Sequence, residues 1–142
     1  MRFGGTSAIL PILVEEPASG AVARELSVDG LVVVGWGTRL ACLSAVARPE
    51  RDGVLVHGGV GSAVRRLDDL ATAWTEVESS DRIRATASRL LRTHPLRAAD
   101  SIQLAAAIAA ADGSPAALSF VTVDARLALV AEREGFPVIR PS

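Results

Sequence analysis

The sequence has 142 residues, a length that suits one domain and leaves little room for two. Hydrophobic residues make up 49% of the chain, which excludes a disordered or fibrous protein, and the one cysteine cannot form an internal disulfide. The formal net charge of −1 gives no overall attraction to nucleic acid or to an anionic membrane. We therefore expect a single domain over residues 1–142.

In the first half of the chain, short apolar runs alternate with helical patterns. The run of Leu, Val, Val and Val at 31–34 is typical of a strand buried on both faces, and three glycines weaken the start of the helical pattern that begins at 54. The patterns predict, in order, a strand at 1–4, helices at 6–14 and 18–28, a strand at 31–34, helices at 38–51 and 54–70, and a strand at 73–77.

The second half continues the alternation. Thr93, His94 and Pro95 predict a helix start, because a capping hydroxyl precedes a proline in the first turn. The predicted elements are a helix at 80–92, a helix from this start to 111, a strand at 118–121, a helix from 124 to 134 and a strand at 137–139. Strands separated by helices predict an α/β fold with a central parallel sheet covered on both faces, whose sites lie beyond the carboxyl ends of the strands.

The ends of the chain and its apolar runs bear on localisation. The N-terminal apolar stretch is broken by Pro11 and followed by two glutamates, which is too short and too acidic for a signal peptide. The alanine-rich run at 101–111 falls well short of the roughly 20 residues needed to span a bilayer. We expect a soluble, cytoplasmic protein with no membrane partner.

Asp100 is the most informative single residue. Leu96, Leu104 and Ile108 lie four residues before, four after and eight after it, which places Asp100 on the apolar stripe of its helix. A carboxylate in that position either pairs with an arginine such as Arg97 or Arg126, or belongs to a functional site. The pattern alone leaves both interpretations open.

Asp124 follows a predicted strand and opens a helix. It fits a helix N-cap, and it also lies at the carboxyl end of a strand, where sites of α/β proteins form. If it converges with Asp100, two carboxylates would suit a hard divalent cation, Mg²⁺ or Mn²⁺. A cap and a metal ligand are not mutually exclusive.

Three other features favour structural roles. His94 fits a helix start better than a catalytic base, and Cys42 fits packing within an apolar helix. Thr6 and Ser7 could bind an anion at a helix N-terminus, although helix capping explains them as well.

Four segments together resemble PIN domains, above all the VapC toxins of bacterial toxin–antitoxin pairs. HPLRAADSIQLAA at 94–106 resembles the third acidic motif of the family, and FVTVDARL at 120–127 resembles the fourth. TSAILPILVEEP at 6–17 is similar to the opening helix, and WGTRLACLSA at 36–45 to the third helix. The likeness spans nearly the whole chain in the right order.

The resemblance implies a PIN-like three-layer α/β/α fold and a specific chemistry. PIN domains are ribonucleases that hold Mg²⁺ or Mn²⁺ in a cluster of acidic residues, where the metal activates water for attack on an RNA phosphodiester. VapC toxins form homodimers and are silenced by a small VapB-type antitoxin. The resemblance therefore implies an RNA substrate, an antitoxin partner and a homodimer for this chain.

Two of the four acidic positions of the family are replaced. Gly5 stands where the first motif carries an aspartate, and Ala41 stands where the second carries a glutamate. Asp100 and Asp124 remain as the expected metal ligands and catalytic acids. Because the number of charged oxygen ligands sets the affinity for a hard dication, we expect catalysis to be impaired or absent.

Three further residues are expected to support this site. Thr6 and Thr122 would orient ligands or bind phosphate, and Arg97 would contact RNA phosphate or pair with the acids. The alternative function is a non-catalytic PIN-like domain that binds an antitoxin or RNA. An unrelated phosphoacceptor or nucleotide-binding domain would need an acidic cluster or a complete phosphate loop, which the sequence lacks.

Overall fold

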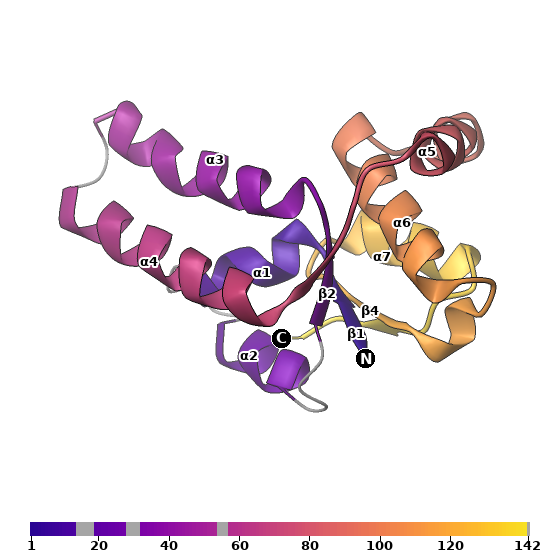
Figure 1. Cartoon of the computed structure of the whole chain (residues 1–142), viewed down its shortest axis with the longest axis horizontal. Coiled ribbons are helices and arrows are strands. Elements are labelled where there is room, and N and C mark those ends of the chain that lie inside the picture. The colour runs from indigo at the N-terminus through magenta and orange to yellow at the C-terminus, as the bar shows by residue number, and fades with distance from the viewer. Residues whose placement is uncertain (14–18, 28–31, 54–56, 142) are drawn as a thin grey trace.

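A parallel five-stranded sheet forms the centre of the computed structural model, which describes residues 1–13, 19–27, 32–53 and 57–141 (Figure 1). Its strands lie side by side in the order β3-β2-β1-β4-β5. Their bounds are Arg2–Gly4 for β1, Val32–Gly35 for β2, Thr75–Val77 for β3, Ser119–Val121 for β4 and Val138–Ile139 for β5. The parallel arrangement predicted from the alternating pattern is confirmed.

The register of the central strands brings apolar side chains into line across the sheet. Phe3 of β1 pairs with Val33 of β2 on one side and with Phe120 of β4 on the other. The rings of Phe3 and Phe120 stack with their centroids 5.3 Å apart. Because successive side chains of a strand point to opposite faces, Val34 and Val121 face the other side of the sheet.

Helices cover both faces of this sheet (Figure 1). Those of the first half of the chain lie on one face, and those of the second half lie on the other. Their bounds are α1 (Thr6–Leu13), α2 (Ser19–Ser27), α3 (Thr38–Arg51) and α4 (His57–Ala73) on the first face, and α5 (Asp81–Thr93), α6 (Ala98–Ala111) and α7 (Ala125–Arg133) on the second. A short 3-10 turn, Pro115–Ala117, leads into β4.

Each face has its own hydrophobic core. Ile9, Val34 and Val121 are fully buried with the apolar side chains of α3 and α4, among them Cys42. On the opposite face, Leu104 is fully buried among side chains of α5, α6 and α7. Burial raises the pKa of the Cys42 thiol to about 12, which agrees with the packing role predicted for it.

Over the described residues the predicted elements agree with the observed ones to within a few residues at their ends, except at two places. Ala73, predicted to begin a strand, ends α4, and β3 begins at Thr75. The start of α6 also differs from the prediction. The predicted positions 14, 18, 28, 31 and 54–56 lie outside those residues. Thr93 does not cap the next helix; it ends α5, and its hydroxyl donates to the carbonyl oxygen of Arg89 at 2.8 Å. The next helix, α6, begins only at Ala98, after Arg97, whose side chain makes no capping hydrogen bond.

The reason for this difference lies in Pro95. A residue before proline is driven out of the helical conformation, and His94 has φ −130° and ψ 153°. His94 is therefore the C-cap of α5 rather than a helix start. The proline acts here as a helix stop, and the chain needs a short extended link before α6 begins.

In the part of the chain that the structure describes, no helix is both long and apolar enough to cross a bilayer.

Candidate functional site

The carboxyl ends of β1, β2 and β4 meet at one edge of the sheet. β1 leads through Gly5 into α1, β2 leads through Gly37 into α3, and β4 leads through Thr122 into α7. The strand order changes direction between β1 and β4, since β2 follows β1 on one side and β4 lies on the other. Such a switch point opens a crevice, and this is where ligands bind in open parallel sheets.

Gly5 lies at the centre of this edge, and the side chain of Gln103 lies against it. The Gly5 N–H donates to the carbonyl oxygen of Val121 at 3.2 Å, and its own carbonyl starts α1 by accepting from Ala8 and Ile9. A Cβ added at Gly5 would lie 3.0 Å from Oε1 of Gln103. That same oxygen accepts from the Thr6 backbone N–H at 2.8 Å, so a neutral amide of α6 satisfies the first N–H of α1.

Thr122 links the segment after β4 to the start of α1. Its Oγ1 lies 2.8 Å from Oγ of Ser7 and accepts from the Asp124 N–H at 3.1 Å, while Ser7 Oγ accepts from the Val123 N–H at 3.2 Å. Thr122 is fully buried. Its hydroxyl is engaged by the protein itself, which fits a positioning role for the segment that carries Asp124.

Asp124 is the N-cap of α7, as its place in the sequence predicts. Its Oδ1 accepts from the backbone N–H groups of Arg126 and Leu127 at 2.9 and 3.1 Å. The side chain is exposed. One carboxylate oxygen is therefore committed to the helix start.

Asp100 lies in the first turn of α6 and is half-buried rather than part of the core. Among the described residues it forms no ion pair with Arg97 or Arg126, so the structural pairing considered from the sequence is absent there. Arg97 is exposed at the N-cap of α6.

The described residues do not fit the metal centre that the resemblance implies. Within residues 1–13, 19–27, 32–53 and 57–141, no three side chains of His, Cys, Asp or Glu lie close enough together to hold an ion. A hard dication needs several oxygen ligands, and Asp100 and Asp124 supply only two carboxylates, one of them capping a helix.

A small hollow beside Gly5 occupies this edge, and we call it the crevice pocket. Its volume is about 120 Å³. Every residue that lines it is uncharged: Thr6, Gly35, Gly37, Thr38, Ala41, Ala99, Ile102 and Gln103. The side chain of Thr38 is 2% exposed, and its hydroxyl has no hydrogen-bond partner among the described residues; the same holds for the hydroxyl of Thr6.

Thr6 and Ala41 both line this hollow, and Gly5 lies beside it against the Gln103 side chain. Sequence reasoning missed Thr38 and Gln103. Thr38 follows Trp36 and Gly37 directly after a strand, which is a signal for the opening of a helix at the sheet edge. Gln103 lies three residues after Asp100 on the same helix, but nothing local indicates that it reaches α1.

His94 belongs to a different cluster, away from the crevice pocket. Its Nε2 lies 2.8 Å from Oε2 of Glu134, and the Arg89 guanidinium donates to Oε1 at 2.8 Å. The His94 and Glu134 side chains are 8% and 15% exposed. The hydrogen bond from Arg89 lowers the pKa of Glu134, the bond from His94 lowers it further, and burial opposes both. The cluster joins the ends of α5 and α7 and has a structural role.

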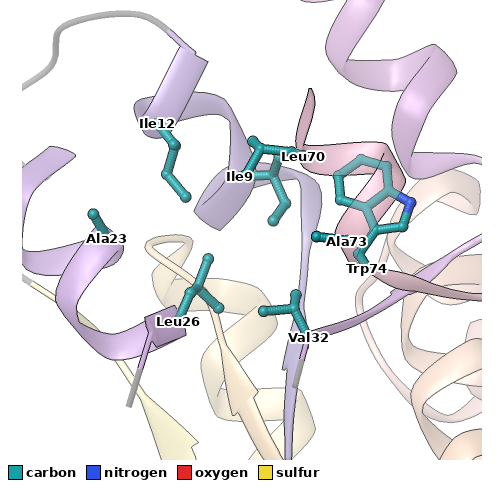
Figure 2. A pocket seen from close by; sticks show the side chains of 8 residues that line it. All are labelled: Ile9, Ile12, Ala23, Leu26, Val32, Leu70, Ala73 and Trp74. Carbon is teal, nitrogen blue, oxygen red and sulfur yellow. The ribbon is translucent and has the colours of Figure 1, made fainter. Parts of the chain in front are cut away.

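A second, larger hollow lies between α1, α2 and the end of α4. Figure 2 shows its lining, to which Ile9, Leu26, Leu70 and Trp74 contribute, and its volume is about 220 Å³. The one polar atom of these four side chains, Nε1 of Trp74, donates to the carboxylate of Glu76 at 3.2 Å. The crevice pocket, in contrast, lies at the edge where the strands end and is lined by the Thr6, Thr38 and Gln103 side chains, so it is the better candidate site.

Comparisons with known proteins give a likeness in structure and none in sequence. No protein-family model matches the chain, and no curated protein matches its sequence. The fold is similar to that of VapC20 from Mycobacterium tuberculosis, a toxin that cleaves the sarcin–ricin loop, with a TM-score of 0.70 and 17% identity. The match covers 99% of this chain and 100% of that one. The protein therefore has the PIN-like α/β/α fold that the motifs around Asp100 and Asp124 predict.

Proposed function

We propose that this chain is a VapC-like domain of a cytoplasmic toxin–antitoxin pair whose metal-dependent ribonuclease activity is impaired or lost. The fold likeness to a VapC toxin and the motifs around Asp100 and Asp124 support the first part. The observation that carries the second part is at Gly5. The amide oxygen of Gln103 occupies the space next to Gly5 and binds the Thr6 N–H, so a neutral group stands where a carboxylate would be needed.

Electrostatics explain why this replacement matters. The affinity of a site for Mg²⁺ or Mn²⁺ depends on how many charged oxygens surround the ion. Gly5 and Ala41 contribute none, and the amide oxygen of Gln103 is a neutral acceptor already engaged by α1. We expect weak metal binding at most, with Asp100 and Asp124 as the remaining acids.

A second candidate function is a non-catalytic domain that binds an antitoxin or RNA and forms a homodimer. Exposed apolar side chains favour a protein partner: Trp36 is 54% exposed, and Leu40 and Leu43 of α3 are 59% and 39% exposed. Trp is enriched at protein interfaces, and apolar side chains that gather into one exposed patch mark an interaction surface. Light scattering tests the homodimer: we expect twice the chain mass for the wild type and a monomer for Leu40→Glu. A monomeric wild type would contradict the homodimer.

Calorimetric titration with Mn²⁺ tests the proposed loss of the metal centre. The wild type is compared with Gly5→Asp/Ala41→Glu and with a triple variant that adds Gln103→Ala, because the Gln103 amide must leave before a carboxylate introduced by Gly5→Asp can turn inward. A control, Gly59→Asp/Ser44→Glu, adds the same two charges at exposed positions outside the crevice pocket.

We expect Mn²⁺ binding and metal-dependent cleavage of RNA by the triple variant, and neither by the control or the wild type. Mn²⁺ binding with normal turnover by the wild type would refute the proposed impairment. If none of the four proteins binds Mn²⁺, the non-catalytic binding domain becomes the better description. The fold would then not bring carboxylates at positions 5, 41, 100 and 124 close enough to bind one ion.

A further inference from the structure

The link between α5 and α6 is tied to the end of a third helix. This link runs over residues 94–97. Nε2 of His94 lies 2.8 Å from Oε2 of Glu134, which is the C-cap of α7, and the two side chains are only 8% and 15% exposed. Among the described residues, no other side chain of the link forms a hydrogen bond or an ion pair. The contact between His94 and Glu134 is therefore the polar side-chain tie between this link and the rest of the fold.

The carboxylate of Glu134 needs these partners. The C-terminal end of a helix carries partial negative charge, which repels a carboxylate placed there. Arg89 donates to Oε1 of Glu134 at 2.8 Å and His94 lies against Oε2, so each carboxylate oxygen has a partner. The bond from Arg89 lowers the pKa of Glu134 more than burial raises it, and the bond from His94 lowers it further. The carboxylate is therefore ionised at neutral pH and binds both partners through charge-assisted hydrogen bonds.

The start of α6 depends on the link, because this helix begins without a cap. Arg97, at the N-cap, makes no side-chain hydrogen bond to the first turn, and the Ser101 N–H donates to the Arg97 carbonyl oxygen at 3.0 Å. A helix whose first N–H groups lack a capping acceptor frays more easily at that end. Asp100 lies in this first turn, and α6 contributes Ala99 and Gln103 to the lining of the crevice pocket. Whatever holds the link therefore also holds the α6 wall of that pocket.

We propose that His94 and Glu134 form a latch that positions the first turn of α6, and with it Asp100 and the α6 wall of the crevice pocket. Neither residue lines the pocket, so both are positioning residues that act through the link. Leu96 also holds the link, since its side chain packs partly buried against the core of the second face. Apolar contact has no preferred direction, whereas a hydrogen bond fixes one. The latch therefore sets the orientation in which the chain enters α6.

Amide hydrogen exchange of the whole chain, followed by NMR, tests the latch. The Ser101 N–H reports on the first turn of α6, and the Trp36 N–H, bonded to Val77 across β2 and β3 at 2.9 Å, serves as a reference far along the chain. We expect His94→Ala to speed exchange at Ser101 by about fivefold to tenfold relative to Trp36, because a charge-assisted bond that restrains the helix start is lost.

A second reporter lies on the other side of the crevice pocket. The Thr6 N–H donates to the side-chain oxygen of Gln103 at 2.8 Å, so its exchange follows the position of that side chain on α6. We expect His94→Ala to speed exchange at Thr6 as well, by about twofold to fivefold. Gln103→Ala removes the acceptor altogether and gives the upper limit of the effect at Thr6.

Two variants separate positioning from a general loss of stability. His94→Gln keeps an N–H donor at about the reach of Nε2, and exchange at Ser101 should return to within about twofold of the wild type. Arg89→Ala removes the other bond to the same carboxylate from a residue within α5, so the link stays tied. With this variant, exchange at Ser101 relative to Trp36 should change by less than about twofold.

Three results would overturn the inference. Unchanged exchange at Ser101 in a folded His94→Ala protein would show that Leu96 alone holds the link. Equal effects of Arg89→Ala and His94→Ala would show that the cluster contributes only to overall stability. Exchange in His94→Gln as fast as in His94→Ala would show that the hydrogen bond to Glu134 is not the cause.

Discussion

A side chain at position 5 and the amide of Gln103 compete for the same space. The Cβ of a residue at position 5 would lie 3.0 Å from Gln103 Oε1, which is tighter than ordinary van der Waals contact. The backbone at Gly5 has no positive φ and so accepts an L side chain. Gly5→Asp must therefore push the amide aside and break its 2.8 Å bond from the Thr6 N–H.

The energy of this competition follows from the bond that is lost. Gln103→Ala removes the acceptor that satisfies the first N–H of α1, and we expect a loss of about 1 kcal/mol of unfolding free energy. Gly5→Asp loses the same bond and costs about the same. In the Gln103→Ala background that bond is already gone, and an aspartate at the N-cap is at least as good as glycine. There we expect Gly5→Asp to be neutral or stabilising.

A double-mutant cycle measured by urea unfolding checks this expectation. The coupling free energy between the two substitutions should be about 1 kcal/mol. In thermal unfolding, the change in melting temperature caused by Gly5→Asp should therefore differ by about 3 °C between the wild-type and Gln103→Ala backgrounds. Gly5→Ala in the same two backgrounds separates the contact of the Cβ from the charge of the carboxylate. Purely additive losses, with Gly5→Asp equally costly in both backgrounds, would show that Gln103 and a side chain at position 5 do not compete for the same space.

Three further predictions concern the scaffold around the site. Thr122→Val breaks the 2.8 Å bond to Ser7 Oγ at a fully buried position and should lower the unfolding free energy by about 1–2 kcal/mol in urea titrations. Because Arg89 lowers the pKa of Glu134 in the folded state, the stability from that cluster should be present above the ordinary glutamate value of 4.5 and lost as the pH falls below it; Glu134→Gln should flatten this acid limb of the stability profile. Cys42, buried with its thiol pKa raised to about 12, should react with a thiol reagent only after unfolding, and rapid labelling of the native protein would contradict its burial.

The local signals in this sequence were sufficient for most of the architecture. Residues 32–34 of the apolar run lie in the central strand β2. Asp124 caps α7 through its own neighbours, because capping depends on residues two and three positions away. The misplaced start of α6 has a local cause too. Pro95 can open a helix or end one, and the preceding His94 takes the extended conformation that ends α5.

The surroundings of Asp100 could not be deduced in the same way. Its spacing with Leu104 places Asp100 on the inner side of α6. However, α6 begins only two residues before Asp100, so this side chain lies in the first turn, at the edge of the helical layer, and is half-buried. Helical periodicity gives the direction of a side chain around the axis. It does not give the depth of the helix end within the fold.

The sequence by itself determined the parallel α/β architecture, the two remaining acids and the absence of carboxylates at Gly5 and Ala41, since these follow from local periodicity and from residue identity. Only the tertiary structure decided which side chain lies against Gly5. Gln103 and Thr6 are 97 positions apart, and the packing of α6 across the sheet is what brings its amide to the start of α1. Sequence patterns encode the faces that elements bury, whereas a contact between a side chain within one helix and the start of another depends on how those faces are finally packed.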